Sequence, residues 1–427
     1  MTSAPAAEKA ATMGDLFRLG KARLYFLGIG LSLFGDNVLV LAAGVWVKTL
    51  TGNDGAGGLV SFFVLFPTLF SALFGVLADR VRKRALMITT NAVMAVVAPM
   101  LLFVQGPSEV WLIYLVMLAY GVALVTLASA QSGLFVAMLP ERLLGTANST
   151  YTSMQEGMKV LAPVAGAALF VWLGGGWIGV IDGLTFLVAC AVLWALQVPE
   201  SPPRPREQRL RAELTQGFRH LATIAELRTV VSAAVVIMLT AGFITTALFG
   251  VVDSELHRPP AFLGVVMSMQ GIGSVLGGLL APRLIASVGE TRMVGFGAGL
   301  NAAGTALLII PAVAAVMPGN LLRGVGLGWM LIGAITLMQR RTGSELIGRA
   351  ASALYMLLFT PSVLALLAGA GLTNLVGHRA LLLAAVALAA AACVFVAIRC
   401  RAATTAPESP HQRSAQDSPR ETFTEEK

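Results

Sequence analysis

The chain has 427 residues, of which 56% are hydrophobic and only 12% are charged, and it carries a formal net charge of +8. Soluble domains carry about 25% charged residues, so this composition excludes an ordinary soluble protein and indicates the lipid bilayer as the solvent. No water is available there to satisfy backbone groups, so the apolar runs must form helices; the strand alternation of a β-barrel is absent from the sequence.

Twelve apolar runs follow one another along the chain, each of them close to the length of about 20 residues that crosses a membrane as a helix. They cover residues 23–47, 57–78, 85–105, 110–132, 152–173, 177–197, 229–251, 261–281, 292–313, 321–339, 351–373 and 379–398. Pro311 and Pro318 interrupt the segment 305–322, so the boundary between the ninth and tenth runs is the least defined. The first run is too long for a cleavable signal peptide.

Positive charges are concentrated in alternate connections between these runs. Both termini and the connections 79–84 and 198–228 are rich in Lys and Arg, whereas the third, fifth and ninth connections contain none. By the positive-inside rule, this pattern predicts a multi-pass protein of the cell membrane with both termini in the cytoplasm. The net positive charge is therefore an orientation signal, and we expect no nucleic-acid partner.

Three short motifs recur in the second half of the chain, each displaced by 203 residues. The pairs are "GVLADR" at 75 with "GLLAPR" at 278, "RLLGTANS" at 142 with "ELIGRAAS" at 345, and "AGAAL" at 165 with "AGAGL" at 368. A repeat in the same orientation predicts two pseudo-symmetric six-helix bundles with a substrate site between them, an arrangement typical of transporters. The expected parts are a cytoplasmic N-terminus, an N-terminal bundle, a cytoplasmic linker, a C-terminal bundle and a disordered cytoplasmic tail, at 1–22, 23–197, 198–228, 229–398 and 399–427.

The stretch "GVLADRVRKR" at 75–84 resembles the signature that the major facilitator superfamily carries between its second and third helices. "LSLFGDNVLVLAAGVWVKTLTG", "LPERLLGTANS" and "QRRTGSELIGRAASAL" are similar to the branch of enterobactin exporters and macrolide efflux pumps. The resemblance covers residues 20 to 400 and implies a secondary transporter. It also implies a cytoplasmic gate, in which Asp79 pairs with cations of a neighbouring helix and Arg80 caps carbonyls or meets a carboxylate. The gating set is Gly75, Asp79, Arg80, Arg84, Gly278 and Arg283.

Ionisable side chains at membrane depth cost at least about 2.5 to 3.5 kcal/mol each, so they are candidates for function. Asp36 lies in the middle of the run 23–47 without a cation three or four residues away, and burial favours its neutral form. It is the first candidate for carrying a proton, and a structural bond to Ser or Asn of another helix is the alternative. In the superfamily, its helix lines the central cavity, so the resemblance places Asp36 where substrate and protons compete.

Four further ionisable residues lie inside the runs. Glu156 and Lys159 are three residues apart, so they share a helix face and either neutralise one another or take part in coupling. For Asp182 we favour a structural role. Arg323 is placed near the outer end of its run, where a long side chain snorkels to the interface, and attraction of anionic substrate groups is the alternative. Weaker candidates for lining a cavity are Asn37, Gln131, Gln155 and Gln270.

Other classes of protein lack support in the sequence. No phosphate-binding loop occurs, and the three cysteines and four histidines are scattered, so we expect no metal site, no cofactor and no enzyme activity. The sequence therefore predicts a monomeric secondary transporter that exports a bulky amphipathic small molecule, such as a drug, siderophore or secondary metabolite, in exchange for protons. The alternatives are an importer or uniporter of a small metabolite and a non-transporting membrane sensor of transporter ancestry.

Overall fold

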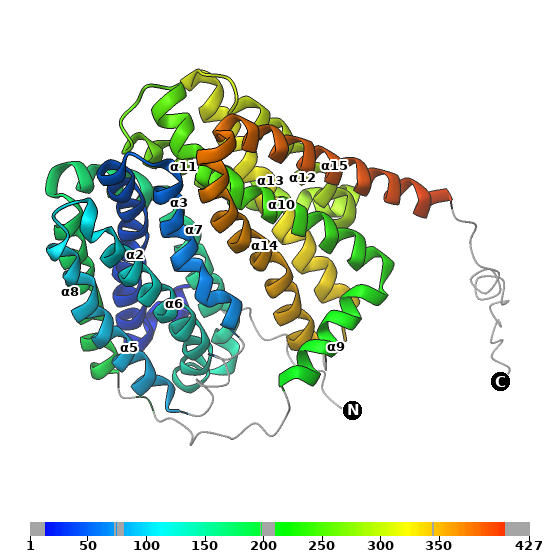
Figure 1. Ribbon diagram of the computed structural model, residues 1–427. Coiled ribbons are helices and arrows are strands. Elements are labelled where there is room, and N and C mark those ends of the chain that lie inside the picture. Colours follow the sequence, from blue (N-terminus) through cyan, green and yellow to red (C-terminus); the bar gives the residue numbers. More distant parts are fainter. Residues whose placement is uncertain are drawn as a thin grey trace, which may run out of the picture.

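The computed structural model describes residues 13–71, 74, 81–196, 198, 210–343 and 346–405. All elements of this part of the chain are helical (Figure 1). The first half contains α1 (Met13–Arg18), α2 (Gly20–Thr51), α3 (Asp54–Leu65) with η1 (Phe66–Phe70), α5 (Lys83–Val97) with η2 (Ala98–Phe103), η3 (Pro107–Glu109), α6 (Val110–Met138), α7 (Glu141–Leu173) and α8 (Gly175–Ala195). The second half contains α9 (Leu210–Thr223), α10 (Ala225–Gly250) with η4 (Val251–Glu255), α11 (Phe262–Val288), α12 (Glu290–Leu307), α13 (Val313–Arg341), α14 (Ile347–Val376) and α15 (His378–Thr405).

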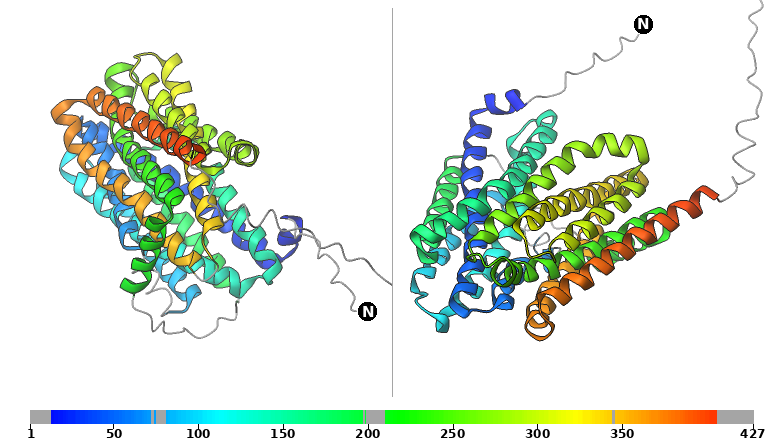
Figure 2. Two further views of the ribbon diagram at one scale, coloured as in Figure 1. Left: turned by 90° about the vertical axis from the view of Figure 1, so that its right-hand side faces the viewer. Right: turned by 90° about the horizontal axis from the view of Figure 1, so that it is seen from above.

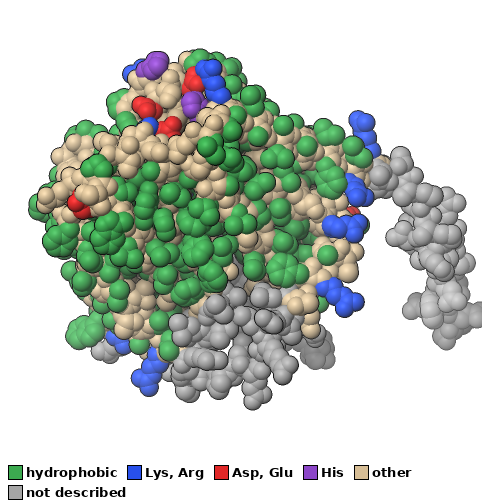
Figure 3. Space-filling view, viewed as in Figure 1, with side chains coloured by type: hydrophobic (Ala, Val, Ile, Leu, Met, Phe, Trp, Pro, Cys, Tyr) green, Lys and Arg blue, Asp and Glu red, His purple; other side chains and the backbone are tan. Residues whose placement is uncertain are grey.

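The helices match the twelve predicted membrane crossings. Ten of the described helices are long and apolar enough to span a bilayer. The shorter apolar stretch Asp54–Phe70 stands at the second predicted run and α12 at the ninth. Figure 3 shows hydrophobic side chains across the middle of the molecule and charged ones gathered toward its ends. The fold is an all-helical membrane protein of twelve crossings, as predicted.

Exposed tryptophans mark both ends of this apolar band. We call the end that carries the connection between α8 and α9 the terminal face, and the end that carries the turns after α2, α7 and α14 the turn face. Trp111, Trp172 and Trp177 are exposed near the turn face, and Trp194 is exposed near the terminal face. Amphipathic rings of this kind settle at the membrane–water interface, so their positions agree with a membrane-spanning chain.

Several boundaries differ from the sequence prediction. Helix α13 begins at Val313 rather than at 321, and Pro318 lies inside it. The predicted linker contains α9, whose Gly217 packs against the backbone of Arg349 in α14. Residues 399–405 of the predicted disordered tail are helical because α15 continues to Thr405; the rest of the tail lies outside the described residues.

The two halves pack their helices in the same way. Helix α2 contacts α7 and α8 in the first bundle, and α10 contacts α14 and α15 in the second. Gly166 of α7 lies against the backbone of Val38, and its repeat partner Gly369 in α14 lies against Thr246 of α10. Viewed from above, the two bundles lie side by side (Figure 2). The repeat in the sequence therefore corresponds to two six-helix bundles of one design.

The bundles are held together mainly toward the turn face. An apolar cluster joins Leu41 and Val45 of the first bundle to Ile244, Leu248 and Leu263 of the second. The helix pairs that meet include α7 with α11, α3 with α14 and α3 with α10. The structure thus has a turn face at which the two bundles are in contact.

Gly55→Val is expected to hold the bundles apart at the turn face. A Cβ at Gly55 would lie 2.1 Å from the carbonyl oxygen of Ala370, so any side chain there must displace α14 from α3. Spin labels attached to α3 and α14 at the turn face should report a longer distance than in the unmodified chain. Gly371→Val is the matched control, since nothing lies within 4 Å of its added Cβ; an equal distance in both variants would contradict the expectation.

Candidate functional site

A cavity of about 50 Å³ lies inside the first bundle, between α2, α5, α6, α7 and α8. This volume holds a few water molecules but not a bulky organic compound. Its walls include the polar side chains of Tyr25, Ser32, Asp36, Asn91, Tyr120, Gln131 and Tyr151. All residues that line it come from the first bundle. The cavity is therefore a site for small polar species within one bundle, and not the space between the two bundles.

The cavity ends at Asp36, which belongs to a pair of buried acids. Asp36 of α2 is 9% exposed and Asp182 of α8 is fully buried. The two carboxyl groups are close enough to interact electrostatically. Gly35 permits this approach, because a Cβ there would lie 2.5 Å from Asp182 Oδ1. The sequence favours a structural role for Asp182 and does not indicate that the two acids meet; the fold brings them together.

The hydrogen bonds of this acid pair are incomplete. The Thr185 hydroxyl donates to the carbonyl oxygen and to Oδ1 of Asp182, at 2.8 and 3.3 Å. Tyr120 is within side-chain hydrogen-bonding reach of the Asp36 carboxylate. Among the described residues, Oδ1 of Asp36 and Oδ2 of Asp182 have no hydrogen-bond partner. Buried carboxylates of one sign are costly without a cation, so this arrangement favours binding of a proton or another small cation.

A second polar group lies where the bundles meet. Lys159 Nζ is 2.6 Å from Glu156 Oε1, so the predicted ion pair is present, and its side chains are 54% and 34% exposed. Ser274 of α11 donates to Glu156 Oε2 at 3.4 Å, which links this pair to the second bundle. Gln155 Nε2 donates to the Tyr151 hydroxyl at 3.1 Å. This stretch of α7 therefore connects the cavity of the first bundle with the surface that faces the second.

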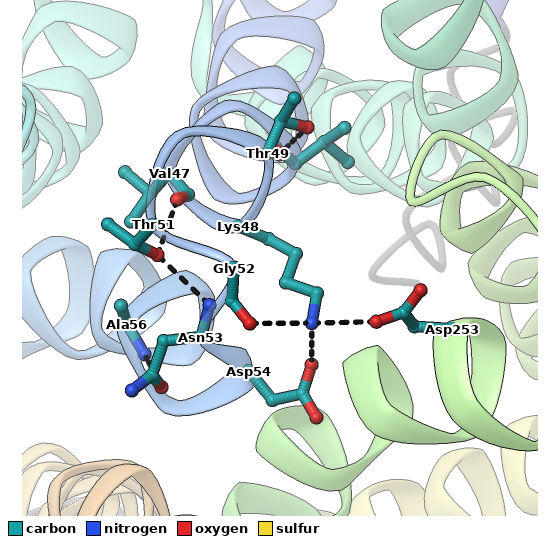
Figure 4. Close-up of polar contacts among 10 residues, drawn as sticks. Val47, Lys48, Thr49, Thr51, Gly52, Asn53, Asp54, Ala56 and Asp253 are labelled. Atoms are coloured by element: carbon teal, nitrogen blue, oxygen red, sulfur yellow. Dashed lines mark hydrogen bonds and ion pairs between the residues drawn. The ribbon is translucent and has the colours of Figure 1, made fainter. Parts of the chain in front are cut away.

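A cluster of charges that sequence analysis missed ties the bundles together at the turn face. Figure 4 shows Lys48 at the end of α2, with Nζ 2.5 Å from Asp54 Oδ1, 2.9 Å from Asp253 Oδ2 and 3.2 Å from the Gly52 carbonyl oxygen. Asp54 belongs to the first bundle and Asp253, in η4, to the second. The sequence showed Lys48 only as the lone cation of its connection, and nothing in it pointed to Asp253. We call Lys48, Asp54 and Asp253 the Lys48 cluster.

The family sequence model described as Major Facilitator Superfamily matches residues 25–252 and 230–425, which together cover nearly the whole chain. The chain belongs to this superfamily. It is accordingly a membrane transporter and not an enzyme, as the sequence resemblance implied. No curated protein sequence matches the chain.

Solved structures of other superfamily transporters share this fold. The nucleoside transporter NupG is 13% identical, with a TM-score of 0.69 over 88% of this chain and 98% of that one. A bacterial homologue of the iron transporter ferroportin in its inward-facing state is 16% identical, with a TM-score of 0.67 over 88% and 98%. A bacterial homologue of the lysosomal transporter Spinster, inward-facing and unoccupied, is 12% identical, with a TM-score of 0.66 over 92% and 99%. At these identities the likeness shows the fold alone.

Arg323 does not snorkel to the interface, so that expectation was wrong. It is 1% exposed in the interior of the second bundle, where the close approach of Gly304 in α12 covers its side chain. Its Nη1 donates to Asn320 Oδ1 at 2.5 Å, and its Nε has no partner among the described residues. Helix α12 packs directly over this side chain.

The weaker candidates are placed in different surroundings. Gln131 is buried and lines the cavity of the first bundle. Asn37 does not line it, and its amide donates to the Leu33 carbonyl oxygen at 2.7 Å within α2. Gln270 is half-buried in α11, with its backbone oxygen against Gly324. Of these candidates, Gln131 lies in the cavity and Gln155 contacts one of its walls, the Tyr151 hydroxyl.

The superfamily signature lies partly outside the described residues, which exclude Gly75, Asp79 and Arg80. Arg84 is described, and it binds the end of α8: Nε donates to the Leu193 carbonyl oxygen at 2.7 Å and Nη2 to that of Trp194 at 2.6 Å. In the second bundle, Gly278 lines an open pocket of about 350 Å³ between α11 and α13, and Arg283 is exposed.

Arg84→Gln is expected to destabilise the fold without altering transport. The guanidinium satisfies two carbonyls at the end of α8, where a cation also complements the helix dipole, so its loss should cost about 1 kcal/mol. Thermal unfolding in detergent should show a lower midpoint. Exposed Arg82, the residue just before α5, supplies the control Arg82→Gln. Loss of transport at unchanged stability would instead assign Arg84 to a gate.

Proposed function

We infer that this transporter exports a bulky amphipathic small molecule in exchange for protons, by alternating opening of the two bundles. The observation that carries the proton part is the Asp36–Asp182 pair, two buried acids with unpartnered oxygens at the end of a small polar cavity. The export direction and the substrate class rest on the resemblance to the efflux branch. Membrane vesicles of either orientation test the direction.

The acid pair suits proton coupling for a physical reason. Two negative charges held together in a low-dielectric interior repel one another, so a first proton neutralises one carboxyl and removes the repulsion. The two charge states therefore differ in how α2 and α8 pack. A difference of this kind is what allows an ion to favour one conformation of a transporter over another.

The small size of the cavity limits the ways in which the flux of protons can be coupled to the flux of substrate. A bulky compound does not fit into about 50 Å³, so it would not displace the proton from Asp36 by direct contact. The space between the bundles, beside Glu156 and Lys159, is the better place for it. We therefore assign coupling to α2, α7 and α8. Helix α2 contacts both of the others. Helices α2 and α8 carry the acid pair, and α7 carries the Glu156–Lys159 pair.

Transport under an imposed pH gradient tests this function. Everted vesicles that contain the protein should accumulate fluorescent cationic dyes and macrolides when their lumen is acid, and the accumulation should collapse with the gradient. Accumulation when the exterior is acid would instead indicate proton-coupled uptake. Equilibration without accumulation under both gradients would indicate a uniporter.

A further inference from the structure

The position of the cavity along the helices reveals which side of the protein its acids face. In α2 the lining runs from Tyr25 to Asp36, the half of the helix nearer the terminal face. In α6 it runs from Tyr120 to Gln131, and α6 crosses in the opposite direction, so this is again the half nearer the terminal face. The acid pair therefore lies at the deep end of a cavity that extends toward the terminal face.

The other side of the acid pair is sealed by apolar packing. Immediately beyond Asp36, α2 contributes Val38 and Leu39 to a buried apolar cluster. Helix α6 contributes Val116 and Met117 to the same cluster, one turn before Tyr120. Tyr120 belongs to this cluster, and Trp46 and Tyr114 pack against it. An apolar layer of this kind opposes the passage of protons, so it separates the acid pair from the turn face in this conformation.

Tyrosine hydroxyls surround the acid pair on the open side. Tyr120 lies within side-chain hydrogen-bonding reach of the Asp36 carboxylate, and Tyr151 lies close enough to interact with Asp36 electrostatically. Gln155 donates to the Tyr151 hydroxyl at 3.1 Å and so fixes its position. Tyr151 is half-exposed and Ala128 is exposed, so the lining reaches the surface at these two residues.

We propose that protons reach the Asp36–Asp182 pair from the terminal face through the cavity of the first bundle, with Tyr120 and Tyr151 as the residues that position this path. Hydroxyl groups that donate and accept can link a carboxylate to water in a cavity of this size. A proton that arrives from the cavity protonates Asp36, and a proton that leaves returns to the same cavity, so no other reactant is required. This inference deepens the proposed function and rests on it for the physiological role of the path.

Infrared spectroscopy of the purified protein tests this path without a transported compound. Asp36→Asn and Asp182→Asn identify the band of the protonated carboxyl. After transfer to deuterated water, the carboxyl proton exchanges for a deuteron and this band shifts. The rate of the shift measures how readily solvent protons reach the acid pair. Tyr120→Phe is expected to slow the shift about tenfold, the effect of losing a hydrogen bond to a charged group. Tyr114→Phe is the matched control, because its hydroxyl donates to the Ala56 carbonyl oxygen at 3.0 Å, away from the cavity.

Further variants test the direction of access. Ala128→Phe fills the exposed edge of the lining and should slow the shift, whereas Val122→Phe, on the exposed outer side of the same helix, should not. Cysteines at Lys48 and Asp253, joined by a short bifunctional thiol reagent, fix the turn face closed and should leave the shift unchanged. A large slowing by this cross-link, or equal rates in Tyr120→Phe and Tyr114→Phe, would overturn the proposal. Normal exchange in a protein that moves no substrate against a pH gradient would contradict only the proposed function.

Discussion

Asp36→Asn should abolish accumulation of substrate against a gradient while leaving downhill exchange. Asparagine keeps the shape and the hydrogen-bonding capacity of the side chain but removes its titration. Asp36 lies at the end of the first-bundle cavity beside Asp182, so without it the remaining acid has no partner with which to share a proton. Loss of coupling to one proton removes the driving force entirely, so uphill transport should fall to background.

Measurements of uphill and downhill transport separate coupling from folding. Dye accumulation in vesicles with an acid lumen should be lost in Asp36→Asn, while counterflow of the same dye without a gradient should persist. Asp182→Asn should behave in the same way if the two acids act as a pair. Asn37→Ala is the control, because Asn37 is adjacent but bonds within α2. If Asp36→Asn still drives uphill export with an unaltered pH dependence, Asp36 is not the coupling site and Glu156 becomes the next candidate.

Asp253→Asn should shift the protein toward the conformation in which the turn face is open. Asp253 is the member of the Lys48 cluster that comes from the second bundle, and its oxygen lies 2.9 Å from Lys48 Nζ. The Lys48 side chain is 7% exposed and that of Asp253 is 48% exposed, so the bond is partly shielded from water. Its loss should cost about 1 kcal/mol, or roughly fivefold in the ratio of the two conformations.

Distances between spin labels across the turn face measure this ratio. The control is Glu255→Gln, which removes contacts with His378 and Arg379 at the same face but within the second bundle. Glu255→Gln should leave the distribution of label-to-label distances unchanged. Asp253→Asn should increase the fraction of long distances, which belongs to the conformation with an open turn face. Asp54→Asn should have a smaller effect, since Asp54 binds Lys48 inside the first bundle. An unaltered distribution in Asp253→Asn would show that apolar packing alone closes the turn face.

Local pattern in the sequence determined the membrane crossings and the repeat. An apolar run of sufficient length must become a helix in lipid whatever it packs against, so the spans follow from composition alone. The Glu156–Lys159 pair was also predictable, because residues three apart on a helix are neighbours. The glycines at 166 and 369 could be equated from the 203-residue offset, and the fold gives them equivalent contacts.

Contacts between distant helices were decided only by the tertiary structure. The sequence gives the face of a helix on which a residue lies, but not the helix against which that face packs, since apolar faces are interchangeable in lipid. From the sequence, Asp36 is therefore expected between the bundles and Arg323 at the membrane–water interface. Helix packing instead places each of them inside a bundle. The Asp36–Asp182 pair and the Lys48–Asp253 bond join residues far apart in the chain, and each forms because close helix packing brings its two side chains together.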